Sequence, residues 1–145
     1  MSMMTPNTYT SLNSKFFPSS LTGTISVPPS SSNFTFELYF FPGKESVFLG
    51  KIILSADPAV NIDRVKLFYE IPPSAWGPSN RVAETDLLPV MDQIGSELQI
   101  TFDMFGTGGN IEAAASGMIV EASSATGGNI SYKVLTFVPL LYYVS

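Results

Sequence analysis

In residues 97–105, ELQITFDMF, polar and apolar side chains alternate without a break from Glu97 to Met104. In an extended chain this alternation places all the apolar side chains on one face, whereas a helix with 3.6 residues per turn mixes the two sets. The stretch therefore predicts a β-strand that packs one face against a core. The side chains that we expect to face inward are Leu98, Ile100, Phe102 and Met104.

Three other stretches also indicate strands. Residues 34–41 and 64–71 alternate with a period of two, and residues 47–54, VFLGKIIL, form a nearly continuous apolar run in which Gly50 predicts a bulge. The faces that we expect to pack inward carry Phe34, Phe36, Leu38 and Phe40 in the first stretch and Val65, Leu67, Tyr69 and Ile71 in the second.

Two segments remain open between structures. Residues 81–95, RVAETDLLPVMDQIG, fit a short strand, a helical turn, or both. Residues 111–122 begin with IEAAAS, whose alanines and glutamate favour a helix, but Gly117 and the β-prone MIVEA that follows favour a strand. The sequence does not decide between helix and strand for 111–122.

The pentapeptide TGGNI occurs twice, at residues 107–111 and 126–130. Glycine and asparagine accept positive φ angles at low cost, so Gly-Gly-Asn suits a tight reversal of the chain. A phosphate-binding loop would instead lead into a helix and is usually followed by a lysine. No lysine follows either copy, and the segment after the second copy is strongly β-prone. Both copies are therefore predicted to be turns between strands.

Short strands separated by turns at intervals of about eight to twelve residues are typical of sandwiches and barrels. We therefore predict an all-β protein with an antiparallel β-sandwich of jelly-roll or immunoglobulin-like type over residues 22–145. Residues 1–21 are predicted to form an extended arm, because they are rich in Ser, Thr and Pro and carry Lys15 as their only charge. This arm is expected to lie on its own domain or on a neighbouring subunit.

Composition excludes several functional classes. Charged residues make up only 13% of the chain, and the net charge is −5. A nucleic-acid-binding protein needs clustered basic residues to replace phosphate counterions, and here the seven Lys and Arg are scattered. A surface with so little charge has less protection against association, which favours contacts with other protein.

The chain contains no cysteine and no histidine, so it can form neither disulfides nor a Cys/His zinc site. Nucleophilic catalysis with a histidine base is excluded, and neither a G-x-S-x-G nor an S-x-x-K motif is present. We interpret the closest carboxylate pairs as solvated turn residues and the DPAVNID loop as a turn without calcium. We therefore predict no enzyme activity, cofactor or metal. The residues weighed for these roles are Asp57, Asn61, Asp63, Glu84, Asp86, Asp92 and Glu97.

Trp76 is the only tryptophan and lies in the proline-rich stretch IPPSAWGPSN. An exposed indole there would stack on a sugar ring or anchor a partner protein, with Tyr69 or Asn80 nearby. Isolated aromatic residues in loops more often fold back over a core, so we expect Trp76 to close one end of the sandwich. Trp76 is the main candidate for ligand contact.

The last stretch, YKVLTFVPLLYYVS, is apolar on both faces. A strand of this kind is expected to be covered on both faces, either inside the sheet or by a partner, with an interruption at Pro139. Together with the arm, it supplies the candidates for subunit contact. These are Tyr9, Phe16, Phe17, Leu140, Leu141, Tyr142 and Tyr143.

In general character the chain resembles small virion proteins of phages and viruses, although it carries no diagnostic motif. This resemblance implies a structural subunit of a capsid, decoration or tail and spike position, made in the host cytoplasm and located in the virion. Its partners would be other copies of itself and other virion proteins. Nucleic acid and membrane are excluded as partners, because no basic patch, secretory signal or bilayer-length apolar run is present. The alternative is a carbohydrate-binding or adhesin module that contacts a surface glycan through Trp76.

Overall fold

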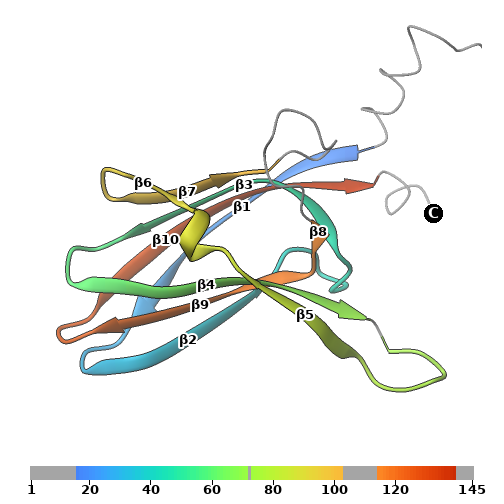
Figure 1. Ribbon diagram of the computed structural model, residues 1–145, viewed down its shortest axis with the longest axis horizontal. Coiled ribbons are helices and arrows are strands. Elements are labelled where there is room, and N and C mark those ends of the chain that lie inside the picture. Colours follow the sequence, from blue (N-terminus) through green and yellow to red (C-terminus); the bar gives the residue numbers. More distant parts are fainter. Residues whose placement is uncertain (1–15, 72, 103–113, 140–145) are drawn as a thin grey trace, which may run out of the picture.

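The computed structural model describes residues 16–71, 73–102 and 114–139, and strands account for most of them (Figure 1). Within these ranges there is no α-helix, which confirms an all-β protein. The elements are β1 (Phe16–Val27), β2 (Ser31–Tyr39), β3 (Val47–Ala56), β4 (Val60–Ile71), β5 (Asn80–Asp86), a 3-10 turn η1 (Leu88–Val90), β6 (Asp92–Ile94), β7 (Glu97–Thr101), β8 (Ala114–Ala115), β9 (Gly117–Ser124) and β10 (Gly128–Pro139).

The strands form two curled antiparallel sheets that face each other, as a β-sandwich does (Figure 1). Sheet A has the order β1-β10-β3-β7-β6, with β8 beside one end of β3, and sheet B has the order β2-β9-β4-β5. Each of the first three connections carries the chain from one sheet to the other. As a result, each sheet contains strands from both halves of the chain.

The pairing of strands is nested. β1 pairs with β10, β2 with β9, β3 with β7 and β4 with β5, all antiparallel. This is the pattern produced when one long antiparallel ribbon is rolled up, with the chain ends at one end of the ribbon and the β4–β5 connection at the other. The β4–β5 hairpin is therefore the folded tip of that ribbon.

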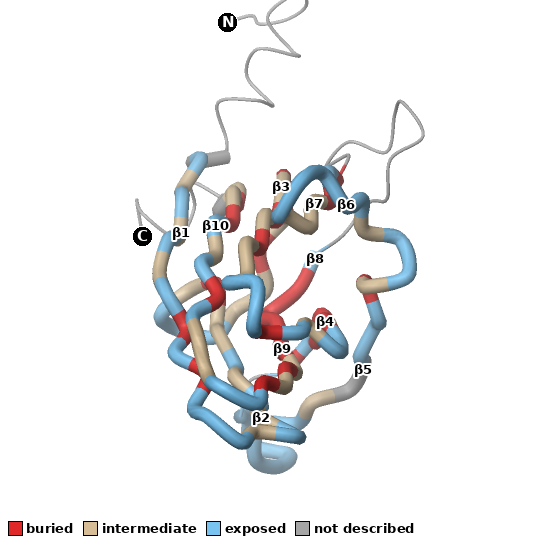
Figure 2. Tube along the Cα trace, turned by 90° about the vertical axis from the view of Figure 1, so that its left-hand side faces the viewer, coloured by how far each residue is buried: buried red, intermediate tan, exposed pale blue. Residues whose placement is uncertain are grey.

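The core lies between the sheets, where Figure 2 shows the buried segments gathered. In β7 the alternation predicts the inner face correctly, because Ile100 and the following Phe102 are buried, while Met104 lies outside the described residues. Gly50 is the predicted bulge: the register between β3 and β10 shifts there, and the extra residue lets Leu49 and Ile52 both point into the core.

The first part of the apolar C-terminal stretch belongs to β10, which lies inside sheet A between β1 and β3. Its side chains Val134 and Thr136 are fully buried, and Leu135 and Phe137 on the outer face are half-buried. The strand ends at Pro139. The contact candidates Leu140, Leu141, Tyr142 and Tyr143 lie beyond it, outside the described residues.

The predicted N-terminal arm is described only from Phe16 onward. From there β1 pairs with β10 along its whole length, so residues 16–21 are a strand of sheet A. The candidate Tyr9 and the side chains of Phe16 and Phe17 lie outside the described part of the chain. Any separate arm is thus limited to residues 1–15.

The second TGGNI copy forms the predicted turn, between β9 and β10. Gly127 has a φ of +87°, and its N–H donates to Ser124 Oγ at 2.8 Å. The N–H of Asn129 donates to Asp57 Oδ2 at 2.8 Å, which ties this turn to the β3–β4 connection. The first copy lies outside the described residues.

The two segments left open by the sequence are now assigned. In residues 81–95 both interpretations hold, because most of β5, the η1 turn and β6 follow one another. In the described part of residues 111–122, the chain forms β8 and most of β9, and no residue between Ala114 and Ala122 is helical.

Candidate functional site: the projecting hairpin of β4 and β5

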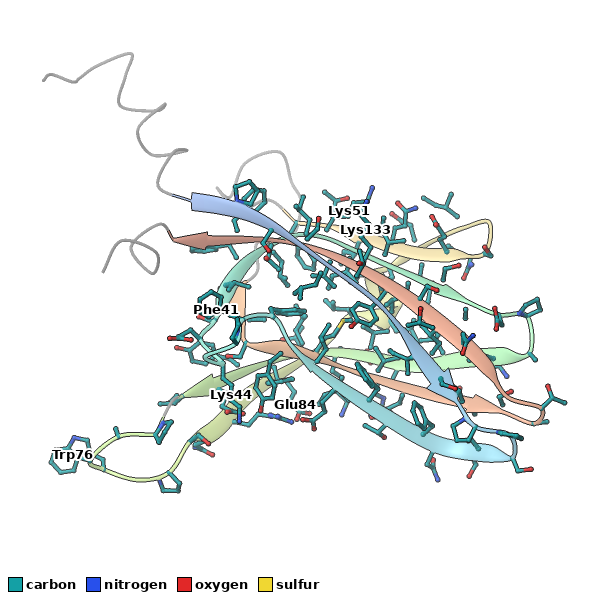
Figure 3. All side chains as sticks on the ribbon, turned by 180° about the vertical axis from the view of Figure 1, so that it is seen from behind. Phe41, Lys44, Lys51, Trp76, Glu84 and Lys133 are labelled. Carbon is teal, nitrogen blue, oxygen red and sulfur yellow. The ribbon has the colours of Figure 1, made fainter. Side chains whose placement is uncertain are left out.

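The β4–β5 hairpin extends past the end of the sandwich (Figure 1). Along the inner face of β4, Leu67 is buried, but Tyr69 and Ile71 are 41% and 46% exposed because no core lies beneath them. At the tip, Trp76 is 98% exposed and points away from both sheets (Figure 3). The interpretation that Trp76 closes the end of the sandwich is therefore wrong.

A narrow turn at the tip explains this position of Trp76. Ser74 and Gly77 exchange two backbone hydrogen bonds of 2.9 and 3.1 Å, and Ser74 Oγ accepts the N–H of Trp76 at 3.2 Å. Closing the turn within these four residues leaves Trp76 at the corner, where its side chain has only outward directions. The prolines at 73 and 78 restrict the backbone on both sides of the turn.

At the base of the hairpin, the aromatic side chain of Phe68 packs on the outer face of sheet B. Phe68 points outward from β4, yet only 1% of it is exposed. The Arg81 guanidinium covers its ring at 3.8 Å from the centroid, and the Tyr39 ring meets it edge-on with centroids 5.2 Å apart. Gly117 of β9 lies opposite Phe68 and leaves room for the ring, because it has no side chain.

Arg81 also ties β5 to the far edge of sheet B. Its two terminal nitrogens donate to the two oxygens of Glu37 in β2 at 3.1 and 3.2 Å, and it lies 3.6 Å from Glu70 Oε1. Tyr39 accepts a hydrogen bond from Arg81 at 3.3 Å and donates one to Glu70 at 2.9 Å. The hydrogen bonds from Arg81 lower the pKa of Glu37, and the same pair raises the pKa of Arg81, so both stay charged.

A second group of ion pairs lies on the same face. Lys66 Nζ contacts Glu84 of β5 at 3.3 Å and Glu121 of β9 at 3.6 Å. The Arg81 and Lys66 groups together connect all four strands of sheet B across its outer face. This arrangement braces the hairpin, because the carboxylates of both ion-pair groups are bound to a cation rather than directed at a cavity.

The carboxylates weighed as catalytic or metal-binding residues have structural partners or are dispersed. Glu84 binds Lys66, and Asp86 accepts the N–H of Leu88 at 3.2 Å. Asp57 and Asn61 border a hollow of about 700 Å³ at the β3–β4 connection, while Asp63 borders a different hollow. In the ranges that the structure describes, no three Asp or Glu side chains gather as metal ligands would.

A second surface, missed by sequence reasoning, lies on the outer face of sheet A. There Ser20, Lys51, Ile53, Lys133 and Leu135 surround a hollow of about 300 Å³. These residues come from three neighbouring strands that are distant in sequence. Without the register of these strands, nothing in the sequence brings the two lysines together.

The candidates of the alternative glycan interpretation lie on one element. Trp76, Tyr69 and Asn80 all belong to the projecting hairpin and are all exposed.

Comparison with protein-family models finds no match, and comparison with curated protein sequences finds none either. No helix in the described part of the chain is long and apolar enough to cross a membrane.

Proposed function

We propose that this protein is a structural subunit of a protein assembly and that the projecting hairpin is one of its contact elements. The observation that carries the proposal is the 98% exposure of Trp76 at the tip of a braced hairpin. Tryptophan is among the residues that contribute most binding energy when they enter a pocket on a partner. The indole of Trp76 is almost fully exposed in the part of the chain that the structure describes, so this binding energy is available to a second surface.

The brace at the base of the hairpin supports this role. A rigid contact element loses less conformational entropy on binding than a flexible one does. The bidentate pair of Arg81 with Glu37 and the covered ring of Phe68 hold β5 against the rest of sheet B. The hairpin therefore holds Trp76 in a fixed position, so little conformational entropy is lost when the indole binds a partner.

Within the β-sandwich class, the strand order favours a jelly roll over the immunoglobulin-like type. An immunoglobulin domain keeps its first two strands in the same sheet, whereas here β1 and β2 lie in different sheets. Eight main strands in two four-stranded groups, β1-β10-β3-β7 and β2-β9-β4-β5, fit the two Greek keys of a jelly roll. Jelly rolls are used in viral capsids and in lectins, so this analogy supports both functions considered for the chain.

The proposed location is a virion, in a capsid, decoration or tail and spike position, with synthesis in the host cytoplasm. The proposed partners are other copies of the chain and other virion proteins. The acidic balance of −5 supports a position away from the genome. The proposed role requires no enzyme activity, since its chemistry is that of surface contacts alone.

The first experiment is the solution mass of the full chain by light scattering across micromolar concentrations. We expect a defined oligomer, and a monomer throughout this range would contradict the proposed function. A variant without residues 1–15 is the matched test of the arm, because it leaves the whole of β1 in place. If residues 1–15 bind a neighbouring subunit, this variant will dissociate at concentrations where the full chain does not.

A second candidate function is a carbohydrate-binding or adhesin module. It is favoured by the exposed Trp76, Tyr69 and Asn80 on one hairpin, because an aromatic ring with nearby polar groups can stack on a sugar. Trp76 is the only tryptophan, so glycan binding would change the intrinsic fluorescence directly. Unchanged fluorescence with every glycan of a broad panel would reject this function.

A further inference from the structure

Two cations on the outer face of sheet A form no ion pair with any residue that the structure describes. Lys51 of β3 lies opposite Leu135 of β10, and Lys133 of β10 lies opposite Ile53 of β3, so the two lysines are diagonal neighbours. Neither lysine forms an ion pair within the described ranges, although Lys66 and the one arginine of β5 do so on sheet B. Among the described residues, these two lysines therefore remain positive charges without an acidic partner, although the chain has twelve acidic residues.

The hollow between these lysines has a mixed chemical character. Ile53 and Leu135 provide apolar walls, Lys51 and Lys133 provide the cations, and Ser20 adds a hydroxyl. Its volume of about 300 Å³ lies at the small end of the range for ligand sites, which suits a single ring system. An ammonium group is attracted to the face of an aromatic ring, most strongly to that of tryptophan.

Trp76 of the same copy does not reach this hollow. Figure 3 shows Trp76 at the tip of the hairpin beyond sheet B, whereas Lys51 and Lys133 lie on the far side of sheet A. The sandwich core separates the two surfaces. An indole that enters the hollow must therefore come from another molecule.

We propose that Trp76 of one copy inserts into the hollow of a second copy, between Lys51 and Lys133. This inference rests on the proposed function, and it names the partner as the chain itself. The aliphatic walls cover the indole while the two ammonium groups approach its face. Because Trp76, the knob of this contact, and the hollow lie on different surfaces, the contact is heterologous. It therefore repeats from copy to copy and forms a ring or an extended array.

The two larger hollows are poorer receptors for an indole, and the one of about 540 Å³ is bordered by the carboxylate of Asp63. The hollow of about 700 Å³ is bordered by the carboxylate of Asp57, by Asn61 and by Gln93. The face of an aromatic ring is negative, so a carboxylate there opposes it. Charge complementarity therefore selects the smaller hollow on sheet A.

The test uses two variants that each lack one half of the contact. Trp76→Ala removes the knob, and the double variant K51E/K133E replaces both cations with anions that repel the indole face. Each is expected to weaken self-association by about tenfold or more, as loss of a central interface residue does. Arg64→Glu is the control, because Arg64 is an exposed basic residue of β4 in the other sheet.

Mixing the two variants gives the decisive readout. Trp76→Ala keeps an intact hollow and has no tryptophan, while K51E/K133E keeps the only tryptophan. On mixing we expect the tryptophan emission of K51E/K133E to shift to the blue as its indole enters the hollow of the other variant. Arg64→Glu is expected to associate like the unaltered chain, and its emission is expected to shift with concentration in the same way.

Two results separate this inference from the proposed function. If the unaltered chain is monomeric at all concentrations, the proposed function fails and the inference with it. If the unaltered chain associates but both variants associate equally well, or if mixing produces no blue shift, the inference fails while the proposed function stands. Circular dichroism of each variant confirms that a loss of association is not a loss of folding.

Discussion

The guanidinium of Arg81 lies 3.8 Å from the centroid of the Phe68 ring and hides an outward-facing aromatic side chain from water. This stacking makes the outer face of sheet B a second, small packing layer. The layer lies where the β4–β5 hairpin leaves the sandwich. The position of Trp76 therefore depends on a side chain in β5 that never contacts it.

Replacing Arg81 with alanine should destabilise the protein by about 2 kcal/mol. The change removes a partly desolvated cation–π contact and the bidentate pair with Glu37, and it exposes the ring of Phe68. Urea denaturation monitored by circular dichroism measures the difference in the free energy of unfolding. The control Arg64→Ala removes an exposed arginine and should cost less than about 0.5 kcal/mol. Equal losses in the two variants would show that the stacking contributes nothing.

Stability should decrease in acid through Glu37. The hydrogen bonds from Arg81 lower the pKa of Glu37 below its ordinary value of 4.5. A carboxylate with a lower pKa in the folded state stabilises the fold above its unfolded pKa and loses this contribution as the pH falls through the folded pKa. Glu37→Gln should therefore show a shallower loss of stability below pH 4.5 than the unaltered chain. The measurement is the free energy of unfolding across this range, and parallel curves for the two proteins would contradict the prediction.

Gly117→Ala should destabilise the protein by about 3 kcal/mol through overpacking. A Cβ atom at Gly117 would collide with the carbonyl oxygen of Leu38 and lie 2.5 Å from Cζ of Phe68. Gly95→Ala is the comparison, because Gly95 has a φ of +62° but open space around its Cβ position, so only backbone strain of about 1 kcal/mol is expected. Thermal unfolding of both variants separates crowding from strain. A smaller loss at Gly117 than at Gly95 would count against the packing described for Phe68.

Trp76→Ala should leave the stability of the isolated subunit within about 0.5 kcal/mol of the unaltered chain. The indole makes almost no contact with its own chain, because it is 98% exposed. Denaturation at a concentration below that of association provides the measurement. A large loss of stability would mean that Trp76 packs against its own domain, and it would remove the main support for the proposed function.

Local patterns predicted the strands well, because alternation and turn residues depend only on neighbouring positions in the sequence. The alternation in residues 97–105 correctly placed Ile100 and Phe102 in the core. Gly50 was correctly predicted at a bulge, since a glycine within an apolar run removes the side chain where the register shifts. The second TGGNI forms the predicted turn for the same local reason.

The site could be predicted only in part, because it depends on register and long-range pairing. Periodicity placed Phe68 among polar residues on the outer face, but its burial requires Arg81 and Tyr39 from two other strands. The hollow with Lys51 and Lys133 appears only once β3 and β10 are aligned. Trp76 was predicted to fold back over the core, and the short Ser74–Gly77 turn prevents this.

Strand β10 sets the time at which β1 finds its partner in a newly made chain. Phe16, the first residue of β1, is made more than a hundred residues before β10 begins at Gly128. At usual rates of synthesis, β1 therefore waits roughly 6 to 22 s for its partner strand to begin. Until then the uncharged edge of β1 is unpaired, and the hollow lacks Lys133 and Leu135. In the array proposed above, a chain cut short before β10 offers no receptor for the indole of a neighbour, so the array would stop at such a copy.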